Sequence, residues 1–83
     1  MKFKAEIDVM PHEALLDPQG KAVTNSMKTI GLSSIDGVRI GKHICLHVEA
    51  ASLEEANKLV DEACKKMLVN QIMEAYHFTV SVA

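Results

Sequence analysis

The chain has 83 residues and a formal net charge of -2, from nine basic and eleven acidic side chains. At this length we expect a single domain, residues 1–83, which buries only roughly 60 to 65% of the surface exposed by its unfolded chain. Because 48% of the residues are hydrophobic, we expect part of the apolar surface to be covered by a partner. The slight acidic excess argues against nucleic acid as that partner.

Two cysteines, Cys45 and Cys64, fall in a strand-like and a helix-like run. No second pair indicates a disulfide framework, so free thiols in a reducing compartment are expected. The sequence lacks a cationic start followed by an apolar run, and its uncharged stretches are too short to span a bilayer. These features predict a cytoplasmic protein that does not enter the membrane.

The first third of the chain predicts a strand followed by a helix. Residues 3–9 alternate between apolar and charged side chains, which is typical of a half-buried strand. Asp17 followed by Pro18 is the arrangement of a capping acid and a proline at the first helical position. Gly31 is suited to end that helix. We therefore expect a helix at 18–30.

The middle of the chain predicts a hairpin and the start of a second helix. Two short apolar runs, within 35–40 and 44–48, are separated by Gly41-Lys42, which favours a turn between two strands. Ser52 and Glu55 then form a capping box, in which the serine hydroxyl caps a backbone N–H and the glutamate reaches back to the N–H of the serine.

The last third continues this helix and adds a strand. Apolar residues recur at helical spacing as far as Leu68, and Asn70 can close the helix. Residues 76–82 alternate as a strand. The resulting order, βαββαβ, predicts an α+β ferredoxin-like fold. It would have a four-stranded antiparallel sheet with both helices on one face, and copies would associate through the sheet.

Three residues with metal-binding atoms, His43, Cys45 and His47, alternate along one predicted strand and so share a face. Neighbours on one face of a strand are roughly 7 Å apart, which is too wide for them alone to enclose an ion. The sequence shows no obvious carboxylate beside them. We therefore interpret them as a mixed sheet face and predict no metal site.

Other patterns give little support for catalysis by this chain. The run from Gly37 to Lys42 resembles a phosphate-binding loop but is one residue short and leads into a strand. Arg39, the only arginine, leaves two interpretations open: a solvated turn, or a cationic patch that contacts a carboxylate surface or a phosphate. No serine or cysteine is spaced for a catalytic triad. We therefore predict no catalytic residue.

Three segments in order resemble one family. They are the run Leu15-Leu16-Asp17-Pro18-Gln19-Gly20-Lys21-Ala22, the run Arg39-Ile40-Gly41-Lys42, and the stretch from Cys64 to Tyr76, with spacing C-x-x-x-L-x-N-x-x-x-E-x-Y. Together they resemble the PurS subunits of phosphoribosylformylglycinamidine synthase, in purine biosynthesis. The resemblance covers essentially the whole chain.

The resemblance implies a non-catalytic accessory subunit of an ATP-dependent carbon-nitrogen ligase, a homodimer or homotetramer. Such a subunit would join a glutaminase subunit to a synthetase subunit and help ammonia reach formylglycinamide ribonucleotide. ATP and Mg would be used by the complex, with no cofactor bound by this chain. The implied structural or contact residues are Asp17, Gln19, Gly20, Arg39, Gly41, Lys42, Asn70, Glu74 and Tyr76.

Two other classes of function remain open from the sequence. A small regulatory module of the same βαββαβ order would bind a ligand such as an amino acid at a dimer edge, although such modules usually sit on a larger enzyme. A metallochaperone would use His43 and His47 to carry zinc or copper.

Overall fold

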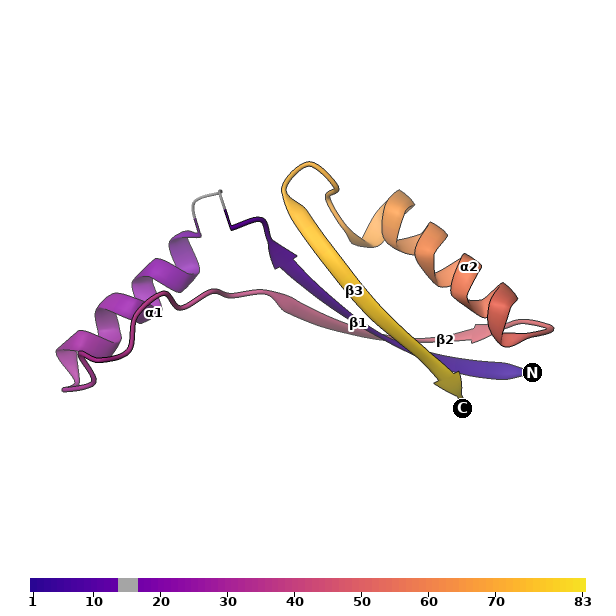
Figure 1. Cartoon of the computed structure of the whole chain (residues 1–83), viewed down its shortest axis with the longest axis horizontal. Helices are drawn as coiled ribbons and strands as arrows, with labels where there is room; N and C mark the ends of the chain where they lie inside the picture. The colour runs from indigo at the N-terminus through magenta and orange to yellow at the C-terminus, as the bar shows by residue number, and fades with distance from the viewer. Residues whose placement is uncertain (14–16) are drawn as a thin grey trace.

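The computed structural model describes residues 1–13 and 17–83, so Leu15 and Leu16 of the first family segment lie outside the described residues. Three strands and two α-helices alternate along the chain (Figure 1). They are β1 (Lys2–Pro11), α1 (Pro18–Thr29), β2 (Lys42–Glu49), α2 (Leu53–Ala63), a π-helical turn η1 (Cys64–Leu68) and β3 (Glu74–Val82).

The sheet has the order β2-β1-β3, and β1 pairs with both neighbours in antiparallel fashion. In this register Ile7 of β1 lies between Ile44 and Phe78. The alternating apolar residues of β1 are completely or almost completely buried and form the centre of the core, which confirms the alternation predicted for residues 3–9; they are Phe3, Ala5, Ile7 and Val9. The opposite face of β1 carries the charged side chains.

Helix α2 packs across the apolar face of the sheet and contacts all three strands (Figure 1). Its inward side consists of Ala56 and Val60, followed by Cys64 of η1, all of them buried. The helix begins as predicted, since the Ser52 hydroxyl accepts a hydrogen bond from the N–H of Glu55. The returning bond differs by one residue: the Glu55 carboxylate accepts from the N–H of Ala51, not from that of the serine.

The prediction of a four-stranded ferredoxin-like sheet was wrong. Helix α1 begins at Pro18 and is capped by Asp17, as expected, but it projects beyond the end of the sheet and does not join α2 on the sheet face (Figure 1). The described residues form three strands, and 35–40 is not one of them. We call residues 17–41, which leave the sheet after β1 and return at the start of β2, the arm.

The segment before β2 runs beside α1 because the helix supplies its hydrogen-bond partners (Figure 1). The N–H of Val38 donates to the Thr24 hydroxyl, and the N–H of Ile40 donates to the Asp17 carboxylate. Side chains of the helix thus satisfy backbone groups that a neighbouring strand would otherwise satisfy.

Gly41 lies at the point where the arm enters β2 and does not form the predicted hairpin turn. A Cβ atom at this position would be 2.3 Å from the carbonyl oxygen of Val9. Glycine therefore permits a close approach between the returning chain and β1.

Within the described residues, none of the helices has the length and apolar character needed to cross a membrane.

Replacing Ile7, which is fully buried, with alanine should lower the free energy of unfolding by about 2 to 5 kcal/mol through lost burial and a cavity. Urea titrations at a fixed protein concentration would measure this loss. The control is Lys4→Ala on the exposed face of the same strand, which should change stability by about 0.5 kcal/mol or less. Equal losses in the two variants would contradict the proposed core.

Candidate functional site

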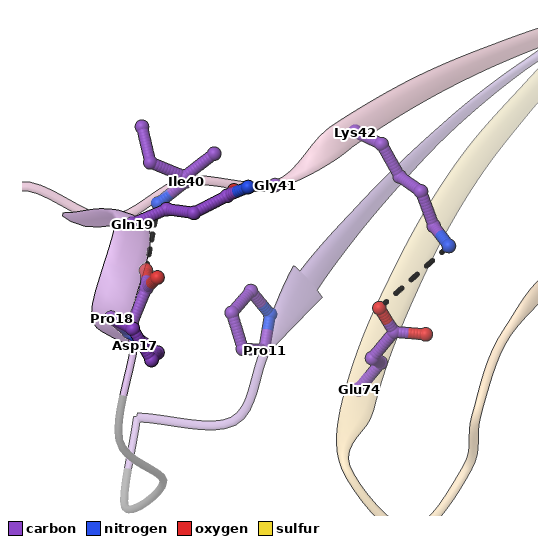
Figure 2. Close-up of a pocket in the computed structure, with 8 residues that line it drawn as sticks. All are labelled: Pro11, Asp17, Pro18, Gln19, Ile40, Gly41, Lys42 and Glu74. Atoms are coloured by element: carbon purple, nitrogen blue, oxygen red, sulfur yellow. Dashed lines mark hydrogen bonds and ion pairs between the residues drawn. The ribbon is translucent and has the colours of Figure 1, made fainter.

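A cavity of about 320 Å³ lies where the arm meets the sheet (Figure 2). We call it the junction pocket. Residues from the end of β1, the start of α1, the start of β2 and the start of β3 line it. They are Pro11, Asp17, Pro18, Gln19, Ile40, Gly41, Lys42 and Glu74. Five of the nine residues implied by the family resemblance are in this lining.

Asp17 holds the two sides of the arm together. One carboxylate oxygen accepts from the N–H of Gly20 at 3.0 Å, which caps α1. The other oxygen accepts from the N–H of Ile40 at 2.8 Å, and Figure 2 shows this second bond. These hydrogen bonds, and to a smaller extent the charge of Arg39, hold the pKa of Asp17 below its ordinary value of 3.8. The charged form of Asp17 is therefore part of the arm structure.

Arg39 ties the arm to the chain that leaves β1. Its guanidinium donates hydrogen bonds to the carbonyl oxygens of Pro11, His12 and Glu13, at 3.0, 2.8 and 3.1 Å. Its Nε atom is 3.6 Å from the Asp17 carboxylate. Because both terminal nitrogens already have partners, the structure favours a positioning role over either interpretation left open by the sequence.

Gly20 is needed for close approach between helix and returning chain. A Cβ atom on this residue would lie 2.1 Å from the carbonyl oxygen of Val38. Gly20 is buried, and this close approach explains why the helix contains a residue type that otherwise weakens helices. The sequence marked it only as part of a motif at the helix start.

Lys42 and Glu74 face each other across the pocket from β2 and β3 (Figure 2), with 3.8 Å between the ammonium nitrogen and a carboxylate oxygen. The other oxygen of Glu74 accepts from the N–H of Asn70 at 2.9 Å. The Asn70 side chain in turn accepts from the N–H of Ile72 at 3.1 Å. Glu74 therefore couples the pocket to the turn that precedes β3.

Tyr76 lies outside the pocket and joins β3 to α2. Its hydroxyl donates a hydrogen bond to the carboxylate of Asp61. This bond, followed by burial, raises the pKa of Tyr76 to about 12. It also lowers the pKa of Asp61, with a smaller contribution from Lys65. The contact attaches the second helix to the sheet.

The structure thus brings together most of the nine residues implied by the family resemblance. Only some of the residues beside them could be predicted from the sequence. Pro11, Ile40 and Thr24 were missed, because their role depends on the arm folding back beside α1. The described lining contains carboxylate, amide and ammonium groups but neither a hydroxyl nucleophile, a thiol nor an imidazole.

Comparisons with known proteins identify the family of the chain. Residues 4–82 match the family model described as PurS: Phosphoribosylformylglycinamidine (FGAM) synthase. The chain belongs to the PurS family. A PurS subunit from Bacillus subtilis is 35% identical over 78 residues, which are 94% of this chain and 92% of that one. A PurS subunit from Thermotoga maritima is 35% identical over 74 residues, 89% and 90% of the two chains.

PurS structures share the fold. A chain in the structure of PurLQS from Thermotoga maritima superposes with a TM-score of 0.89 at 32% identity, covering 98% of this chain and 99% of the other. The three-stranded α+β fold is therefore that of the PurS family, and the family relation connects this chain with FGAM synthase and purine biosynthesis.

Replacing Arg39 with alanine should release the base of the arm while leaving the sheet intact. Loss of its charge-assisted hydrogen bonds corresponds to about 1.5 to 3 kcal/mol. Amide hydrogen exchange at Val38 and Ile40 should therefore be about 10- to 150-fold faster. Exchange in β1 is the internal control, and an equal acceleration there would show that Arg39 supports the whole fold.

Acid should open the same junction. Because the folded-state pKa of Asp17 is depressed, its contribution to stability is complete above about 3.8 and is lost as pH falls through the lower folded-state value. An NMR titration should show the Gly20 and Ile40 amide resonances shifting together in that acidic window. In Asp17→Asn this coupled shift should be absent. Its persistence in the variant would assign the transition to another carboxylate.

Proposed function

We propose that this chain is a non-catalytic bridging subunit of FGAM synthase that joins a glutaminase subunit to an ATP-dependent synthetase subunit. The similarity to the PurS chain in PurLQS, over nearly the full length of both chains, is the observation that carries this proposal. The chain would hold the two active sites in register and assist transfer of ammonia to formylglycinamide ribonucleotide. ATP and Mg would be used by the synthetase, in the cytoplasm.

The arm supports association of two or more copies of the chain. Ile30, Leu32 and Ile35 at its tip are 68%, 44% and 39% exposed. At the same time, α2 leaves the apolar side chains of β2 and β3 only half-buried. A single chain thus has an uncovered apolar arm and an incompletely covered apolar sheet face. The arm of one copy would cover the sheet of another, giving a homodimer or a homotetramer.

A second apolar surface is available for the catalytic subunits. Met67 at the end of η1 and Ile72 in the following turn are 86% and 87% exposed, and Met73 is half exposed. This turn is fixed to the junction pocket through Asn70 and Glu74. Because large apolar side chains on a braced turn are suited to a protein contact, we assign this surface to a catalytic subunit.

Reconstitution with the two catalytic subunits tests the bridging role. Glutamine-dependent activity should require this chain, whereas ammonia-dependent activity of the synthetase should not. The variant Ile72→Glu should remove most glutamine-dependent activity and weaken co-purification, because it places a charge in the proposed contact.

The matched control is Lys58→Glu, which adds an acid at an exposed position of α2 and should leave assembly unchanged. If the wild-type chain forms no complex with either subunit, with or without glutamine and ADP, the bridging role is wrong. If Ile72→Glu assembles as well as the wild type, the contact surface lies elsewhere.

The oligomer is tested separately by light scattering after gel filtration. Ile30→Glu should convert the wild-type oligomer to monomer, since it introduces a charge into the apolar tip of the arm. Asn25→Glu, at another exposed position of α1, should leave the mass unchanged. A wild-type chain that is monomeric at micromolar concentration would contradict the proposed exchange of arms.

A further inference from the structure

The sheet face opposite α2 contains a group of metal-binding side chains that the bridging role does not use. Glu6 of β1 and His43 and Cys45 of β2 present a carboxylate oxygen, an imidazole nitrogen and a thiol sulfur within 4.8 Å of one another. All three residues are exposed. The sequence placed His43 and Cys45 on one face but gave no indication that a carboxylate stands between them.

Strand pairing brings this group together. Glu6 lies directly opposite Cys45 in the antiparallel register, and His43 is opposite Asp8, one position further along the face. Side chains opposite each other on neighbouring strands are roughly 4.5 to 5.5 Å apart at Cβ, closer than successive residues on one strand face. The cluster therefore forms across two strands, whereas His47 lies beyond it on β2.

Asp8 orients the imidazole of His43 for metal binding. The Asp8 carboxylate is 2.6 Å from Nδ1 of His43. Because an ionised carboxylate only accepts hydrogen bonds, this contact favours the imidazole tautomer with its proton on Nδ1, in which Nε2 is the nitrogen that can bind a metal ion. Nε2 is the nitrogen that faces the Glu6 carboxylate, at 3.9 Å. A carboxylate behind a ligand histidine is the usual outer partner of a zinc-bound imidazole.

We propose that Glu6, His43 and Cys45 form a binding site for Zn²⁺, with Asp8 as a positioning residue. A set of one oxygen, one nitrogen and one sulfur suits this borderline-soft ion, while Mg²⁺ and Ca²⁺ require oxygen ligands. Cys45 binds as the thiolate and gives its proton to solvent. The exposed face leaves a fourth position open to water.

The ligand atoms need only a small inward movement. Tetrahedral zinc distances place neighbouring ligand atoms roughly 3.3 to 3.8 Å apart, compared with up to 4.8 Å between the three ligand atoms in this structure. Rotation of exposed side chains on a fixed pair of strands can supply this difference. The site is independent of the bridging proposal, since none of its residues lines the junction pocket or belongs to the arm.

The experiment is a zinc titration of the full chain after chelator treatment, in competition with a chromophoric chelator. One Zn²⁺ should bind per chain. Glu6→Gln, His43→Gln and Cys45→Ser should each weaken binding at least about tenfold, without changing the melting temperature of the zinc-free protein. In the Co²⁺-loaded protein, a thiolate-to-metal absorption band should appear and should vanish in Cys45→Ser. Cys64 cannot replace it, because it is the first residue of η1 and is fully buried in the core on the other face of the sheet.

The matched control is His47→Gln, an exposed histidine on β2 outside the cluster, which should bind zinc like the wild type. Asp8→Asn should weaken binding about 10- to 100-fold and alter the Co²⁺ spectrum, whereas Asp8→Glu should recover part of the affinity. Three results would overturn the proposal. They are a stoichiometry of half a zinc ion per chain, a cobalt band that persists in Cys45→Ser, and an equal loss of zinc affinity in His47→Gln and His43→Gln. So would the absence of saturable zinc binding.

Discussion

The carboxylate of Asp17 connects a helix start with a chain segment 23 residues further on, because its two oxygens accept from Gly20 and from Ile40. This pair of hydrogen bonds determines that the chain before β2 lies beside α1. The guanidinium of Arg39 then ties the same segment to the carbonyl groups at the end of β1. The direction of the arm relative to the sheet therefore depends on a small polar junction.

Local signals predicted most element boundaries because they act over a few residues. Asp17 and Ser52 cap the helices that the sequence assigned to them, and the alternation of residues 3–9 gives the buried face of β1. The segment 35–40 has the composition of a strand but finds its hydrogen-bond partners on α1. Its placement depends on a long-range contact, which residue composition does not encode.

The same distinction applies to the candidate sites. Five of the contact residues implied by the family resemblance line the junction pocket. The physical roles of the implied residues appear only in the fold: Arg39 contacts backbone carbonyls, and Gly20 leaves room for Val38. The sequence indicated only part of the proposed zinc site, because the strand periodicity placed His43 and Cys45 on one face. Glu6 joins them through the pairing of β1 with β2, a register that a single strand pattern does not specify.

The antiparallel pairing of β1 with β2 also determines which part of the fold can vary during evolution. The chain leaves and re-enters the sheet at the same end, so the arm is topologically a long insertion within a hairpin. Its helix can be lengthened, shortened or resurfaced while the strand register and the α2 packing stay as they are. The surface of the arm is thereby separated from the core that makes the chain fold, and the two can evolve at different rates.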